Sequence, residues 1–176
     1  IKNALEQTSL REENARLREL VGGAPRMIGT SPAFERVLEQ ATLASRSDAR
    51  ILLIGESGTG KEIIARYLHE LSTRTEGPFL SINCGALPEG LLESELFGHV
   101  KGSFTGAVRD KVGLFGASTK GTFFLDEIGE TTPATQVKLL RALQHREVIP
   151  VGSTDAIPVD TRVLAATNRD LDEEIR

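Results

Sequence analysis

The run Gly55-Glu56-Ser57-Gly58-Thr59-Gly60-Lys61 constrains the fold of this 176-residue chain more than any other feature. It follows the short apolar run Arg50–Ile54 and precedes an apolar pattern with helical spacing over residues 64–71. Glycines between a strand and a helix let backbone N–H groups form a nest around phosphate oxygens, and the helix N-terminus adds partial positive charge. A lysine at this position reaches the β- and γ-phosphates. The sequence therefore predicts a phosphate-binding loop, which comprises Gly55, Glu56, Ser57, Gly58, Thr59, Gly60 and Lys61, with Glu62 directly after it.

One position departs from the general form of this loop. Glu62 stands where a Ser or Thr hydroxyl commonly ligates Mg²⁺, so the sequence does not assign this side chain as an inner-sphere ligand. A glycine-rich turn that binds nothing is the alternative interpretation, and the flanking strand and helix patterns disfavour it.

Two carboxylates, Asp126 and Glu127, end the apolar run that begins at Thr122. Ligands of open α/β sheets bind at the carboxyl ends of the strands, so a strand that neighbours the phosphate loop would place Asp126 beside a Mg²⁺ ion. Glu127 would then act as the base for the water that attacks the γ-phosphate. The beginning of an acidic surface loop is the alternative.

Two asparagines also end predicted strands. Asn83 follows the apolar residues of Phe79–Ile82, and Asn168 follows Val163–Thr167. Asn168 could hold the water or sense the γ-phosphate, and Asn83 could bind Glu127 and control its use as a base. Each asparagine could instead close a local turn with its own backbone.

Strands and helices alternate from Met27 onward, which predicts βαβ units and a central parallel sheet flanked by helices. Strands are expected at Arg50–Ile54, Phe79–Asn83, Thr122–Leu125 and Arg162–Ala166. A helix is expected after each of the pairs Ser31-Pro32 and Thr132-Pro133, where the first residue is the N-cap. In the second of these helices Val137, Leu140 and Leu143 lie on one side; a further helix is expected over Pro88–Leu96.

The composition excludes several classes of protein. A net charge of −4 argues against a nucleic-acid-binding surface, and the single cysteine, Cys84, excludes a disulfide framework or a multi-cysteine zinc site. No apolar run is long enough for a membrane span, so we expect no membrane partner. The use of one cysteine fits a reducing cytoplasm, so a cytoplasmic location is expected. Cys84 is expected to be buried, and the three histidines, which lack metal-ligand spacing, to be packing or surface residues: His69, His99 and His145.

Residues 1–24 differ in composition from the rest and are expected to form a helical linker. Ile1–Val21 contains neither Gly nor Pro, and Leu10 and Leu17 at heptad d positions place Asn14 at a, a residue known to fix coiled-coil register. A dimeric coiled coil and a solvated helix that packs on its own domain are equally compatible with so few heptads.

The combined motifs resemble one family, the NtrC-like AAA+ activators of sigma-54 RNA polymerase. The residues that carry the resemblance span Met27 to Arg176, and Glu62 is itself typical of this family. The most specific piece is a six-residue loop, in which the family usually reads Gly-Ala-Phe-Thr-Gly-Ala; here Ser103 replaces the first alanine. The matching stretches are Gly55–Glu62, Glu95–His99, the loop Gly102, Ser103, Phe104, Thr105, Gly106 and Ala107, the pair Asp126-Glu127, and Ala166–Asn168.

The resemblance implies an ATPase with ATP and Mg²⁺ as cofactors, which works as a ring, usually a hexamer. It implies that the loop at residues 102–107 contacts the sigma factor and remodels the closed promoter complex, and that Val148–Val159 is a second loop beneath it. It further implies that residues 1–24 join a regulatory domain, often the receiver of a two-component system. Arginine fingers, a helical lid and an enhancer-binding helix-turn-helix are expected beyond residue 176, and neither Arg162 nor Arg169 is assigned as a finger.

Two other functions remain open at this point. Another AAA+ ATPase, such as an unfoldase or a chelatase subunit, would share the nucleotide-binding residues but would have no reason to carry the 102–107 loop. A module that binds nucleotide or a partner without turnover is the second alternative, and it applies above all to residues 25–176 taken alone.

Overall fold

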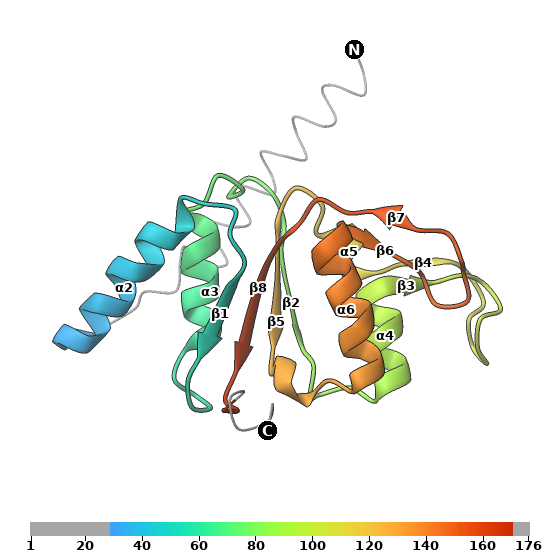
Figure 1. The fold of residues 1–176 in the computed structure, drawn as a ribbon, viewed down its shortest axis with the longest axis horizontal. Coiled ribbons are helices and arrows are strands. Elements are labelled where there is room, and N and C mark those ends of the chain that lie inside the picture. The colour runs from blue at the N-terminus through green and yellow to red at the C-terminus, as the bar shows by residue number, and fades with distance from the viewer. Residues whose placement is uncertain (1–28, 171–176) are drawn as a thin grey trace, which may run out of the picture.

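The computed structural model describes residues 29–170 and has a four-stranded parallel sheet at its centre (Figure 1). All neighbouring strands are parallel, so their carboxyl ends meet at one edge of the sheet. This confirms the predicted α/β class with a parallel sheet. The strand order is β1-β8-β5-β2, with bounds β1 Ile51–Ile54, β2 Phe79–Asn83, β5 Thr122–Asp126 and β8 Arg162–Thr167.

Helices cover both faces of the sheet and form two apolar cores. On one face, α2 (Pro32–Ser45) and α3 (Lys61–Glu70) pack through Ala41, Ala65 and Leu68. The other face carries the larger core, to which α4 contributes Leu96 and α5 Phe115. The elements on this face are α4 Glu89–Phe97, α5 Leu114–Ala117 and α6 Pro133–His145, and the short 3-10 helix η1, Ile128–Glu130, follows β5.

The two predicted Ser/Thr-Pro helix starts are confirmed. Ser31 accepts a hydrogen bond from the Phe34 backbone N–H at 3.3 Å, and Thr132 accepts one from the Thr135 N–H at 3.4 Å. In each helix a proline occupies the first turn, where its missing N–H would have had no partner. These local signals fix where α2 and α6 begin.

Two small antiparallel hairpins lie beyond the β2 side of the sheet (Figure 1). The first joins β3 (Gly98–His99) to β4 (Lys111–Val112), and the second joins β6 (Glu147–Val148) to β7 (Ile157–Pro158). Val151 connects the two hairpins, since its N–H donates to the Gly98 carbonyl and its carbonyl accepts from the Val100 N–H. The loop at 148–159 therefore lies against the segment that carries residues 102–107, as the resemblance implied.

The apolar side of α6 that the sequence shows faces the core only at Leu143, which packs against the larger core. Val137 is 69% exposed and Leu140 is 52% exposed, whereas Thr135, Leu139 and Ala142 face the core. Both stripes have helical spacing, and the structure uses the one that ends in a small alanine. From the sequence alone, the stripe with the larger apolar side chains is the more prominent of the two.

Within residues 29–170, no helix is long and apolar enough to cross a membrane. The predicted linker helix at residues 1–24 lies outside the described residues.

Candidate nucleotide site

The phosphate loop follows β1 and leads directly into α3, as predicted. Gly58 and Gly60 have φ values of +78° and +86°, a region that side chains rarely adopt, so glycine is required at both positions for this path. The Thr59 hydroxyl donates to the Glu56 carbonyl at 2.8 Å and tightens the turn. Because α3 begins at Lys61, its first backbone N–H groups are directed toward the loop, which is the geometry of an anion site.

Two charged side chains of this region have well-defined partners. The Lys61 ammonium donates to the carbonyl oxygens of Gly55 and Glu56 at 2.9 and 2.8 Å, which holds it over the loop. Glu62 instead pairs with Arg66 at 3.0 Å, one turn along the same helix. The Glu62 carboxylate is thereby partly neutralised by its own helix.

The carboxylates Asp126 and Glu127 lie at the carboxyl end of β5. The Glu127 N–H donates to Asp126 Oδ1 at 3.0 Å, and Glu127 adopts a left-handed conformation with φ of +52°. Such a conformation costs on the order of 1–3 kcal/mol and is concentrated at functional sites.

The strand order corrects one expectation about this pair. Asp126 does not lie on a strand next to the phosphate loop, because β8 separates β5 from β1. Asn168, which directly follows β8, is therefore the predicted polar residue nearest to the loop along the edge. An open pocket of about 570 Å³ lies between the segment of β1 and the phosphate loop and the segment that follows β8. Its lining residues are Leu52, Ile54, Gly55, Glu56, Asn168, Arg169 and Asp170.

Asn83 closes a local turn. Its Oδ1 accepts from the backbone N–H groups of Gly85 and Ala86 at 2.8 and 3.1 Å, which is the alternative that the sequence left open. Among residues 29–170 no hydrogen bond joins Asn83 to Glu127, although Asn83 Oδ1 and Glu127 Oε2 both border residue 85. A Cβ at residue 85 would lie 2.8 Å from Glu127 Oε2, so Gly85, which the sequence did not single out, gives the Glu127 carboxylate its space.

Cys84, as predicted, is buried. Burial, with the nearby charges of Asp126 and Glu127, raises the pKa of its thiol to about 12. The thiol is therefore protonated and unreactive at neutral pH. In the part of the chain that the structure covers, no three His, Cys, Asp or Glu side chains gather as a metal site would require.

The arginines near the end of the chain have structural partners. Arg162 is 2% exposed and donates to the carbonyl oxygens of Ala44, Ser45 and Ala49, so it caps the C-terminal end of α2. Its burial lowers the pKa of its guanidinium. Arg169 is paired with Glu130 at 2.8 Å.

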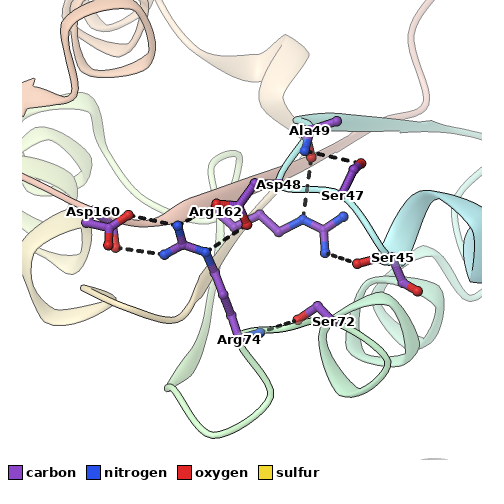
Figure 2. Close-up of polar contacts among 8 residues, drawn as sticks. All are labelled: Ser45, Ser47, Asp48, Ala49, Ser72, Arg74, Asp160 and Arg162. Carbon is purple, nitrogen blue, oxygen red and sulfur yellow. Dashed lines mark hydrogen bonds and ion pairs between the residues drawn. The ribbon is translucent and has the colours of Figure 1, made fainter.

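Figure 2 shows Arg162 beside a second arginine, Arg74, at the amino end of β8, opposite the phosphate loop. Arg74 donates to both carboxylate oxygens of Asp48 and also binds Asp160. These contacts join the segment after α2, the segment after α3 and the segment before β8. The cluster joins parts of the scaffold at the end of the sheet opposite the phosphate loop.

The loop at residues 102–107 is closed on itself and rests partly on its own domain. The Gly102 N–H donates to the Ala107 carbonyl at 2.8 Å. Phe104 is 41% exposed, and its ring makes a T-shaped contact with the His99 ring at a centroid distance of 5.0 Å. His99 is held in turn by Ser94 of α4 at 2.8 Å. The loop thus presents a half-exposed aromatic ring that packs on a histidine of its own domain.

Ser103 has an unusual environment for a polar residue. Its hydroxyl oxygen is buried and has no hydrogen-bond partner. Gly152 of the second loop lies against it, since a Cβ at residue 152 would meet the Ser103 Cβ at 2.4 Å. The serine therefore places a polar group where the family usually has a methyl group.

The fold and the phosphate loop define a P-loop NTPase core of the AAA+ type. A family model described as "Sigma-54 interaction domain" matches residues 27–176, and the chain belongs to this family.

Several curated relatives are similar over most of the chain. A Nif-specific regulatory protein of Bradyrhizobium diazoefficiens is 56% identical over 149 residues, which is 85% of this chain and 26% of that protein. The transcriptional regulatory protein ZraR of Salmonella typhimurium is 50% identical over 175 residues, 99% of this chain and 39% of its own length. The chain thus spans well under half of the relatives that it matches.

A crystal structure of NtrX from Brucella abortus superimposes with a TM-score of 0.80 at 32% identity, over 99% of this chain and 37% of that one. NtrX has also been crystallised in complex with ADP and with ATP.

Proposed function

We propose that this chain is the nucleotide-binding core of an ATP-hydrolysing activator of sigma-54 RNA polymerase. The observation that carries the proposal is the meeting of the phosphate loop, Asn168 and the Asp126-Glu127 pair at the carboxyl edge of one parallel sheet. This is the edge at which ligands bind in open α/β folds. The NtrX complexes with ATP and ADP support nucleotide binding by the fold.

Each residue of the edge has a separate role in this proposal. The backbone N–H groups of the loop and Lys61 bind the phosphates, as a preorganised nest and a point charge. Glu127 orients and deprotonates the attacking water, and Asn168, between Glu127 and the loop, holds that water or the γ-phosphate. Asn83 and Gly85 shape the space in which the Glu127 carboxylate lies.

Asp126 is the residue that fits a Mg²⁺ ion. Mg²⁺ prefers carboxylate oxygens and needs only one or two from the protein, because substrate phosphates and water complete its shell. Oδ1 of Asp126 accepts a hydrogen bond from the Glu127 N–H. This bond orients the Asp126 carboxylate at the end of β5, where it could bind the ion. Glu62, paired with Arg66, is not needed as a ligand. Bound there, the metal would neutralise charge on the phosphates.

The 102–107 loop is the sigma-54 contact in this proposal. Phe104 and Thr105 stand on a turn between Gly102 and Gly106, which have φ values of +83° and +105°. A half-exposed aromatic ring next to a hydroxyl is suited to a partner surface. An unfoldase or a chelatase subunit would have no use for this loop, which disfavours the rival AAA+ functions.

The complete protein would work as a cytoplasmic ring, usually a hexamer, and would bind enhancer DNA through a C-terminal domain. Residues 1–24 would link the core to a regulatory domain and could hold a dimer. These statements extend the family resemblance to the whole protein. For residues 25–176 alone, we propose nucleotide binding with little turnover, because the arginine fingers and the lid are expected after residue 176.

The experiment that tests the activator function is a paired assay of ATP hydrolysis and promoter opening with Thr105→Ala in the complete protein. ATP affinity and basal hydrolysis should stay within about twofold of wild type, since a change on the surface away from the site has small effects. Capture of sigma-54 in the presence of ADP–aluminium fluoride, and open-complex formation, should both be lost.

Two other outcomes of this assay would count against the proposal. Normal activation by Thr105→Ala would exclude the loop as the sigma contact and favour another AAA+ function. Loss of hydrolysis together with promoter opening would indicate that the loop supports ring assembly instead.

A further inference from the structure

A small cavity lies beside the arginines shown in Figure 2, at the end of the sheet opposite the phosphate loop. Its volume is about 40 Å³, which is enough for roughly three water molecules. The apolar part of its lining belongs to the larger core. We call it the arginine cavity; its polar lining residues are Asp48, Arg50, Arg74, Arg146, Thr161 and Arg162.

The arginine cavity has an excess of positive charge. Four arginines line it, whereas Asp48 is the one carboxylate in its lining. Both oxygens of Asp48 accept hydrogen bonds from Arg74, which also binds Asp160 outside the cavity. Even with Asp160 included, two of the four guanidinium charges are not balanced by a carboxylate. Charges near a buried space are unfavourable unless they are paired, so the cavity is suited to an anion.

The unbalanced charges belong to three arginines in different surroundings. Arg50 and Arg162 donate to main-chain carbonyl oxygens at the ends of α6 and α2, which carry only partial negative charge. Burial lowers the pKa of the Arg162 guanidinium, and Asp48 offsets this only in part. Among residues 29–170 the exposed Arg146 side chain has neither a hydrogen bond nor an ion pair. Arg146 is therefore free to bind a ligand in the cavity.

Thr161 provides a second, independent sign of a ligand. It lines the same cavity, and its hydroxyl oxygen is buried without a hydrogen-bond partner in the part of the chain that the structure describes. Buried hydroxyl groups in folded proteins almost always have a partner. A water molecule in the cavity would satisfy the hydroxyl but would leave the arginines unbalanced, whereas an anion satisfies both.

We infer that the arginine cavity binds a free tetrahedral oxyanion of the size and charge of inorganic phosphate. Arg146 and Thr161 donate hydrogen bonds to the ion, and Arg50 and Arg162 supply further positive charge. Guanidinium groups suit such an ion, because their planar N–H donors match a pair of oxygens. The bound ion joins the end of α6 to the segment before β8. This site is separate from the nucleotide site and does not depend on the proposed function.

Thermal unfolding of the chain in inorganic phosphate tests this site, with ionic strength held constant by chloride. A ligand that binds only the folded state raises the unfolding temperature, by roughly 3–6 °C at about ten times its dissociation constant. Above that constant the rise should follow the logarithm of the phosphate concentration. Phosphate also stabilises folded proteins by exclusion from their surface, but that contribution grows in proportion to concentration.

Two variants separate these contributions. Arg146→Gln should abolish the logarithmic part of the rise, while the matched control Arg141→Gln, an exposed arginine of the same helix outside the cavity, should respond like wild type. Thr161→Val keeps the shape of the side chain and removes its hydroxyl. Without phosphate this variant should unfold at or above the wild-type temperature, and its affinity for phosphate should fall several-fold, a combination that a purely structural threonine would not give.

Two further measurements locate the ion and define its size. The phosphate loop is itself an anion site, so the titration is repeated in the Lys61→Ala chain, where the part of the rise that depends on Arg146 should persist. Ribose 5-phosphate carries the same group on a sugar that the cavity has no room for, and it should give no Arg146-dependent rise.

Three results would each overturn the inference. The first is an equal response to phosphate in wild type and Arg146→Gln. The second is loss of the Arg146-dependent part in Lys61→Ala, which would assign the ion to the phosphate loop. The third is an Arg146-dependent response to ribose 5-phosphate as large as the response to inorganic phosphate.

Discussion

At the carboxyl edge of the sheet, several single residues adopt backbone conformations with positive φ, and polar groups there are held by hydrogen bonds. Gly58 and Gly60 adopt positive φ, which shapes the phosphate loop, and Glu127 adopts the same region despite its side chain. A non-glycine residue is held there only when the surrounding structure compensates for the strain. The hydrogen bond from the Glu127 N–H to Asp126 contributes to that compensation.

The clearest prediction at this scale concerns Ser103. A buried hydroxyl without a partner costs about 1–3 kcal/mol, so Ser103→Ala should increase the free energy of unfolding by about 1 kcal/mol or more. Urea unfolding of the chain measures this change. In the complete protein the same variant, which restores the usual family residue, should preserve or raise promoter opening. A variant less stable than wild type would mean that the hydroxyl has a partner.

At the scale of helices and strands, local signals in the sequence predicted most of the fold. The Ser31-Pro32 and Thr132-Pro133 pairs marked two helix starts, and the glycine-rich loop marked the junction between β1 and α3. Short-range chemistry of this kind acts within a few residues and can be read from sequence.

Long-range arrangements could not be predicted in the same way. The placement of β8 between β1 and β5 depends on how whole strands pair, and no spacing in the sequence encodes that order. The choice between two stripes of α6 depends on packing against a sheet that the pattern does not contain. Gly85 was missed because its role appears only when the Glu127 side chain has been placed next to it.

The cluster around Arg74 gives a prediction about pH. Hydrogen bonds from the Arg74 guanidinium hold the pKa of Asp48 below its ordinary value of 3.8. A carboxyl with a lowered pKa in the folded state stabilises the fold above its unfolded pKa, and this contribution is lost as the pH falls through the folded pKa. Asp48→Asn should therefore be less stable than wild type at neutral pH, and the difference should shrink below about pH 4.

Urea midpoints measured from neutral to acidic pH test this behaviour. Asp155→Asn is the matched control, because no ion pair of Asp155 exists among residues 29–170. A difference between Asp48→Asn and wild type that is constant with pH would contradict the account.

The whole molecule has a division of roles between the two ends of its sheet. The carboxyl end carries the phosphate loop and the carboxylates, while the amino end of β8 carries the arginine cluster that joins three segments of the scaffold (Figures 1 and 2). The 102–107 loop lies on the small hairpins outside the sheet. The proposed nucleotide site, the arginine cluster and the proposed partner-binding loop thus lie in different parts of the molecule.

At this scale we predict that the 176-residue chain alone binds nucleotide but hydrolyses it slowly. Arginines supplied by a neighbouring subunit contribute about 10³- to 10⁵-fold to phosphoryl transfer, and the family resemblance places them after residue 176. Phosphate release should stay near background over a wide range of protein concentration. Robust hydrolysis that rises with the concentration of the chain would refute this prediction.

The central claim is that the carboxyl edge of the sheet binds and hydrolyses ATP, and the most direct measurement compares ATP affinity with hydrolysis in two variants of the complete protein. Glu127→Gln should bind ATP like wild type while hydrolysis falls by about 10²- to 10⁴-fold, because the amide cannot accept the proton of the water. Lys61→Ala should instead weaken ATP binding by roughly ten- to a hundredfold. Hydrolysis at the wild-type rate by Glu127→Gln, or unchanged ATP affinity in Lys61→Ala, would contradict the assignment of this site.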